Sequence, residues 1–132
     1  MDIYKNDNVI LDVRDLKVHF PIKKGMFRKT VGHVKAVDGV NFSIKEGETL
    51  GLVGESGCGK TTTGRSLIRL IEPTAGNVLY RDGENITNIS DLDKKPMKNL
   101  RKDIQMIFQD PYSSLNPRMT VYELIAEPMR VY

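Results

Sequence analysis

A glycine-rich loop at residues 54–61 constrains the fold of this chain more than any other feature. It reads Gly54-Glu55-Ser56-Gly57-Cys58-Gly59-Lys60-Thr61 and satisfies the phosphate-loop pattern G-x-x-x-x-G-K-[ST]. A short apolar run at 49–53 precedes the loop and predicts a buried central strand. Helical spacing of apolar positions over 60–71 follows it. The order strand, glycine loop, helix predicts an α/β fold of the P-loop NTPase kind.

The loop residues explain why this pattern binds a polyphosphate. Glycine permits the backbone to turn its N–H groups toward phosphate oxygens, and the following helix adds its free N–H groups and positive dipole end. We expect Lys60 to contact the outer phosphates, Thr61 to ligate Mg²⁺ and Thr62 to donate to an inner phosphate. The alternative without a function is a helix whose N-terminus happens to follow a glycine-rich turn. The expected cofactors are ATP and Mg²⁺, and the nucleotide-binding residues in this segment are Gly54, Glu55, Ser56, Gly57, Cys58, Gly59, Lys60, Thr61 and Thr62.

The composition fits one globular unit. The chain has 132 residues, of which 39% are hydrophobic and 28% charged. Its apolar runs are too short to cross a bilayer, and its first residues lack the pattern of a secretory signal. Cys58 is the only cysteine, which excludes an internal disulfide. These features predict a cytoplasmic location.

Before the loop, the pattern predicts an antiparallel β region over residues 9–47. Alternating apolar residues at 9–20 predict a half-buried strand, and 21–32 is expected to be a loop. Short strands are expected at 34–37 and 41–45, joined at Asp38-Gly39.

After the loop, the pattern predicts alternating helices and strands. A strand is expected at 78–81, ending at Asp82-Gly83, then a basic helix at 94–102 and a buried strand at 104–108. Thr120 and Glu123 form a capping box for a last helix, which Pro128 is expected to shorten or kink.

The charge is concentrated in one segment. The net charge is only +3, but every charged residue between Leu16 and Val37 is basic. The commoner explanation is a solvated hairpin; the alternatives are nucleic acid or anionic lipid. We expect no specific nucleic-acid partner, and we expect His19 and His33 to be surface residues. The basic side chains are Lys17, Lys23, Lys24, Arg28, Lys29 and Lys35.

Three segments together resemble the ATP-binding subunits of ABC transporters, and most closely the second ATPase of oligopeptide or dipeptide importers. The first two are Val34-Lys35-Ala36-Val37-Asp38-Gly39-Val40 and the run from Gly47 through the loop to Thr62. The third and more specific is Met106-Ile107-Phe108-Gln109-Asp110-Pro111-Tyr112-Ser113-Ser114-Leu115-Asn116-Pro117-Arg118-Met119-Thr120-Val121. The resemblance runs from end to end of the chain.

The resemblance implies roles for two residues outside the loop. Phe20 matches the aromatic residue that stacks on adenine, although a strand phenylalanine is more often part of a core. Gln109 matches the glutamine that reaches Mg²⁺ and the attacking water, although it could be only a polar strand end. Lys60 and Gln109 are thus the expected catalytic residues, and Thr61 and Gln109 the expected metal ligands. Generic P-loop rules would choose Asp110 as the Walker B aspartate, but Gln109 interrupts the apolar run and Pro111 follows.

The resemblance also implies which part of a larger domain this chain represents. It implies the N-terminal part, residues 1–132, of a nucleotide-binding domain: an antiparallel region at 9–47, strand, phosphate loop and helix at 48–72, and a strand with the Q-loop at 104–120. The signature, the Walker B aspartate with its catalytic glutamate and the switch histidine are not in this sequence, and we expect the C-terminal half to be absent.

The implied function is the energy-coupling ATPase of a peptide importer, peripheral on the inner face of the membrane. The implied partners are a paired ATPase subunit and, through the segment after Gln109, integral-membrane permease subunits. The alternatives are a catalytically inert nucleotide-binding fragment, a nickel-type importer ATPase and a basic nucleic-acid-associated ATPase. Whether this chain itself is an enzyme stays open.

Overall fold

The computed structural model describes residues 3–4, 8–110 and 115–131. The chain divides into two compact units, Met1–Leu92 and Asp93–Tyr132. In the described segments, no helix combines the length and the apolar character that a bilayer crossing requires.

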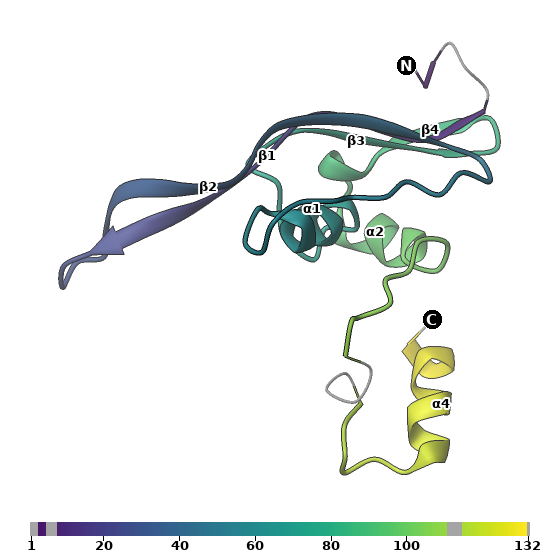
Figure 1. Ribbon diagram of the computed structural model, residues 1–132. Helices are drawn as coiled ribbons and strands as arrows, with labels where there is room; N and C mark the ends of the chain where they lie inside the picture. Colours follow the sequence, from purple (N-terminus) through teal and green to yellow (C-terminus); the bar gives the residue numbers. More distant parts are fainter. Residues whose placement is uncertain (1–2, 5–7, 111–114, 132) are drawn as a thin grey trace. The chain divides into compact units, whose positions relative to one another are not determined.

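The first unit is built on an antiparallel sheet with the strand order β2-β1-β3-β4 (Figure 1). Its strands are β1 (Val9–Lys24), β2 (Lys29–Lys45), β3 (Ala75–Asp82) and β4 (Asn85–Asn88). The strand predicted at 9–20 is confirmed and continues to Lys24, and the strand predicted at 78–81 is confirmed and extends at both ends. The sequence pattern missed β4, which the two-residue turn Gly83-Glu84 joins to β3 as a hairpin.

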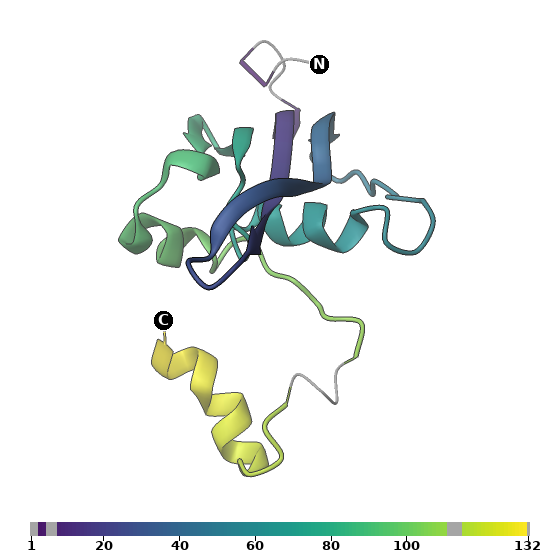
Figure 2. The same ribbon diagram turned by 90° about the vertical axis from the view of Figure 1, so that its left-hand side faces the viewer.

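Helix α1 (Lys60–Leu67) covers one face of this sheet and contacts β1 and β2 (Figures 1 and 2). The short 3₁₀ helix η1 (Ile89–Asp91) follows β4. Apolar side chains of these elements are buried, as their spacing predicts. The buried apolar residues of the first unit are Ile3, Val9, Val13, Leu16, Val18, Val37, Ile68, Val78, Leu79 and Ile89.

Strand β1 is interrupted by a bulge at Asp15, which adopts a left-handed conformation with φ 48°. The register of β1 shifts there against both β2 and β3. The backbone N–H of Asp15 donates to Oδ1 of Asn41 at 2.8 Å, so a side chain satisfies the group that the ladder leaves free.

The two short strands predicted at 34–37 and 41–45 are wrong as separate elements, because β2 is continuous through Asp38 and Gly39. Gly39 has φ +80°, and a Cβ there would lie 3.3 Å from Oδ1 of Asp15. Leu16 pairs with Val40 and Lys17 with Asp38, so Gly39 is the extra residue of a bulge instead of a hairpin turn.

The loop predicted at 21–32 is also mostly wrong. Residues 21–24 and 29–32 pair as the end of the β1–β2 hairpin, and only the turn between them is irregular. The Lys, Gly and Pro content is typical of loops, but pairing between β1 and β2 continues through this segment, with Pro21 opposite His33.

Two predicted buried strands are absent from the described part of the chain. Residues 49–53 and 104–108 carry no strand assignment, and Val53 and Ile107 are 94% and 97% exposed. A strand exists only when neighbouring chain satisfies its N–H and C=O groups, and no described segment pairs with either run.

Helix α1 ends four residues before the predicted 71. Arg69 adopts a left-handed φ of 49°, and its guanidinium donates to the Ile89 carbonyl at 3.3 Å, to the Leu92 carbonyl and to the Glu72 carboxylate. These tertiary contacts end the helix earlier than the apolar spacing indicates.

The second unit contains α2 (Lys94–Leu100) and α4 (Val121–Val131). The predicted basic helix and the predicted capping box are both confirmed: Thr120 N donates to Glu123 Oε2 at 2.7 Å, and Glu123 N to Thr120 Oγ1 at 3.3 Å. The expected shortening at Pro128 is wrong, because α4 continues to Val131. A proline removes one intrahelical hydrogen bond, which the rest of α4 tolerates.

Candidate nucleotide-binding site

The glycine-rich loop folds around the amine of Lys60. Lys60 Nζ donates to the carbonyl oxygens of Gly54 and Glu55 at 2.6 and 2.7 Å, and lies 3.5 Å from Cys58 Sγ. Residues 54–58 are exposed. The lysine amine is thus held by two neutral carbonyl groups of its own loop.

No acidic or capping side chain of the described residues occupies the N-terminus of α1. Gly59 is its N-cap residue, with φ 97°, and no side chain caps the helix. The first turn has no acidic residue either. The first N–H groups of a helix have no intrahelical partner, so this end combines free donors with the positive end of the dipole. Thr61 at this end is exposed.

Gly59 also fixes the loop against the sheet. A Cβ at Gly59 would lie 2.3 Å from the carbonyl oxygen of Ala36 in β2. Such a contact is impossible for any residue with a side chain. The sequence pattern explains the glycines of the loop by the need of the backbone to approach phosphate. The packing of Gly59 on Ala36 is a second reason, and no local pattern in the sequence indicates it.

The same part of β2 leads to Phe20. Val34 and Lys35 directly precede Ala36 in β2. Val34 pairs with Phe20 of β1, and Lys35 pairs with His19. Phe20 is 42% exposed, so its ring is available to a ligand instead of forming core. Gly59 therefore packs on the residue of β2 that lies two positions along the strand from Val34, the partner of Phe20.

An ionic cluster lies beside Phe20. Asp38 accepts from Lys35 Nζ at 3.0 Å, and its other oxygen lies 2.9 Å from His19 Nε2. The hydrogen bond from Lys35, and then the one from His19, lowers the pKa of Asp38. The sequence predicts a surface residue at His19, but its side chain is only 17% exposed because this contact holds it against the sheet.

Gln109 belongs to the second unit, where its side chain is exposed. The loop residues and Phe20 belong to the first unit. The segment predicted to meet a permease begins directly after Gln109, and its residues 111–114 lie outside the described residues.

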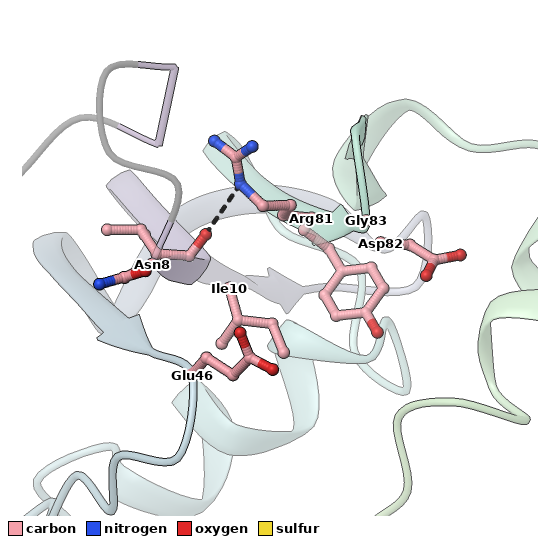
Figure 3. A pocket seen from close by; sticks show the side chains of 8 residues that line it. Asn8, Ile10, Glu46, Arg81, Asp82 and Gly83 are labelled. Carbon is pink, nitrogen blue, oxygen red and sulfur yellow. Dashed lines mark hydrogen bonds between the residues drawn. The ribbon is translucent and has the colours of Figure 1, made fainter.

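A cavity of about 270 Å³ lies elsewhere in the first unit (Figure 3). The Arg81 guanidinium borders it and donates through Nε to the Val9 carbonyl at 3.2 Å, and through Nη2 to the Ile3 carbonyl. Arg81 therefore ties β3 to the start of β1, which is a structural role. The residues around this cavity are Asn8, Val9, Ile10, Glu46, Tyr80, Arg81, Asp82 and Gly83.

Several known proteins are similar to this chain in sequence. The chain is 55% identical over 127 residues to the oligopeptide transport ATP-binding protein AppF of Bacillus subtilis strain 168, covering 96% of this chain and 38% of AppF. It is 52% identical over 128 residues to the oligopeptide transport ATP-binding protein OppF of Escherichia coli strain K12, covering 94% of this chain and 36% of OppF. The chain thus spans less than two-fifths of the length of these relatives.

Two solved structures have a similar fold. The dimeric structure of MJ0796, a bacterial ABC transporter cassette, superposes with a TM-score of 0.71 at 24% identity, and covers 93% of this chain and 48% of its own. The post-hydrolysis state of the MJ0796 ATP-binding cassette, bound to ADP and Pi, superposes with a TM-score of 0.70 at 30% identity and the same coverage. These similarities confirm the expected fold class.

The family pattern itself covers most of the chain. The pattern described as ABC transporter matches residues 37–131, which include the glycine loop, α1, Gln109 and α4. Since this match extends over well more than half of the sequence, the chain belongs to the ABC transporter family.

Proposed function

We propose that this chain is the phosphate- and adenine-binding part of an ATPase subunit that powers peptide uptake. The observation that carries the proposal is Lys60, whose amine lies inside an exposed loop on two carbonyl oxygens. A phosphate oxygen would replace these neutral acceptors with a charged one, which forms a stronger hydrogen bond. The relatives named as oligopeptide transport ATP-binding proteins support the same assignment.

The loop also fits a metal-bound nucleotide chemically. Mg²⁺ prefers hard oxygen ligands and retains several waters, so one hydroxyl from Thr61 and one amide oxygen from Gln109 are suitable protein ligands. The ion would neutralise phosphate charge when bound. Lys60 would then hold the outer phosphates, while Gln109 would position the water and report the nucleotide state to the permease.

Phe20 is proposed to hold the base. Its ring is exposed on β1, and β2 links it to the strand position that Gly59 touches. An exposed aromatic ring offers the apolar surface on which a purine stacks.

The proposed whole assembly has a second ATPase subunit and membrane permease subunits, and it acts on the inner face of the cell membrane. Hydrolysis needs charge stabilisation from several sides. The alternative for this chain alone is a module that binds nucleotide without turnover, and the alternative cargo is nickel.

Nucleotide binding is tested by calorimetric titration of the full chain with ATP, with and without Mg²⁺. Lys60→Ala is expected to weaken binding about tenfold or more, because it removes a charge-assisted hydrogen bond. Lys98→Ala, an exposed lysine of α2, is the matched control. Equal affinities for Lys60→Ala and Lys98→Ala would refute the phosphate site.

The adenine role needs a ligand that lacks the base. Phe20→Ala is expected to weaken binding of ATP but leave binding of inorganic triphosphate unchanged, whereas Val34→Ala on the paired strand changes neither. ATP turnover by the wild-type chain above a Lys60→Ala background would favour an active enzyme over the inert module.

A further inference from the structure

The tip of the β1–β2 hairpin presents two large apolar side chains to solvent. Gly25 to Arg28 form a tight turn, closed by the Arg28 N–H on the Gly25 carbonyl at 3.1 Å. Met26 and Phe27 occupy its central positions and are 93% and 85% exposed. Solvent-exposed apolar residues at such a turn are costly to leave in water.

The hairpin end stands apart from the rest of the sheet. Strand β3 pairs with β1 only between Leu11 and Lys17, so β1 and β2 continue beyond it as a two-stranded ribbon (Figure 1). Within the first unit, the turn lies at the far end of this ribbon from β4. A ribbon of this kind can reach a surface that the sheet itself does not touch.

Four cations surround the two apolar residues: Lys23, Lys24, Arg28 and Lys29. Lys24 and Lys29 are directly paired across the strands, an arrangement that repels. Lys17 and Lys35, at the other end of the ribbon, have acidic partners in Asp15 and Asp38. Among the described residues, none of the four tip cations has an ion-pair partner.

We propose that this tip docks on an anionic lipid bilayer, with Met26 and Phe27 entering the headgroup boundary and the four cations contacting lipid phosphates. Anionic headgroups relieve the repulsion between Lys24 and Lys29, and the acyl boundary removes the apolar tip from water. A nucleic acid satisfies the cations equally well but leaves Met26 in water, so the lipid surface accounts for both features. The contact does not depend on nucleotide.

Co-sedimentation of the full chain with vesicles tests the charge. Vesicles of phosphatidylcholine and phosphatidylglycerol are expected to bind the chain, and vesicles of phosphatidylcholine alone to bind it much less. Replacing Lys23, Lys24, Arg28 and Lys29 together by Gln is expected to weaken binding about a hundredfold or more, since each such cation contributes about fivefold. The matched control replaces four exposed cations of the second unit by Gln: Lys94, Lys95, Lys98 and Arg130.

A fluorescence experiment tests insertion of the tip. The chain has no tryptophan, so Phe27→Trp creates a single reporter. Its emission is expected to shift to the blue on anionic vesicles, whereas the emission of Ile107→Trp, a site outside the hairpin that is 97% exposed, stays unchanged. Lys60→Ala is expected to keep full vesicle binding, which separates this inference from the nucleotide site.

Three outcomes would overturn the inference. One is an equal loss of vesicle binding in the tip and control quadruple variants, since that means general charge attraction. Another is an unshifted emission of the Phe27→Trp variant on vesicles that do bind the chain. The third is salt-sensitive binding to a single-stranded RNA that is tighter than vesicle binding and is lost in the tip variant.

Discussion

Three glycines near the phosphate loop differ in what their positions demand. Gly59 combines a left-handed φ of 97° with contact to the Ala36 carbonyl. Gly57 has φ 83° and no atom within 4 Å of a Cβ placed there. Gly51 has no left-handed φ and also faces open space. Alanine at Gly57 therefore tests the cost of the left-handed backbone alone, and alanine at Gly59 tests that cost together with the contact to Ala36.

Alanine at these positions is expected to lower the free energy of unfolding in the order Gly51, Gly57, Gly59. Gly51→Ala should change it by less than about 0.5 kcal/mol. Gly57→Ala should cost about 1–2 kcal/mol, since a Cβ crowds the carbonyl in the left-handed region. Gly59→Ala should cost more, because the loop must also move off β2. Urea unfolding followed by circular dichroism measures all three, and equal values would contradict the assignment of Gly59 to the β2 contact.

At the scale of elements, local signals succeeded where the element satisfies its own backbone. Helix α4 begins at the predicted capping box, and Glu123 Oε2 accepts from both the N–H and the hydroxyl of Thr120. These two hydrogen bonds favour the ionised carboxylate and lower the pKa of Glu123, the backbone one more strongly.

The cap of α4 is therefore expected to weaken in acid. Because the pKa of Glu123 is lowered in the folded chain, its contribution is complete above the ordinary pKa of a glutamate and is lost as the pH falls through the lowered value. Hydrogen exchange of the Thr120 amide measures this, and its protection should fall over that acidic range. In Glu123→Ala the protection should be low at every pH, while Glu127→Ala should behave like the wild type. A Glu123→Ala chain with wild-type protection would refute the cap.

Local signals failed where an element needs a partner. The runs at 49–53 and 104–108 have the apolar composition of buried strands, yet they carry no strand assignment and pair with no described segment. The opposite occurs in β2, where a strand forms although the sequence does not predict it. Pairing with β1 keeps β2 continuous at Gly39 and in the basic segment whose composition predicts a loop. Pairing, which is a long-range property, decides both outcomes.

At the scale of the molecule, the unpaired runs leave apolar surface exposed in both units. Val53 in the first unit and Ile107 in the second lie almost fully in solvent. Unpaired backbone segments with exposed apolar side chains can pair with another chain. Such surfaces favour association between copies.

The chain is accordingly expected to self-associate at micromolar concentration. Val53→Lys and Ile107→Lys should each raise the monomer fraction, because they remove apolar surface and add a charge within an unpaired run. Asn99→Lys in α2 adds the same charge to an exposed polar position and should have little effect. Analytical ultracentrifugation measures the monomer fraction, and a wild-type chain that is fully monomeric would contradict the expectation.

The sequence alone predicted a nucleotide-binding loop, because the loop and its helix are contiguous in the chain and the proposed binding depends on local backbone geometry. Glycine, lysine and threonine at fixed spacing were sufficient for that. The tertiary structure decided what is non-local. It paired Phe20 with Val34 in the β1–β2 ladder, gave Gly59 its contact with Ala36, and left the runs at 49–53 and 104–108 unpaired. The physical reason is that the loop's donors lie within a few residues of one another, whereas strand pairing joins residues far apart in sequence.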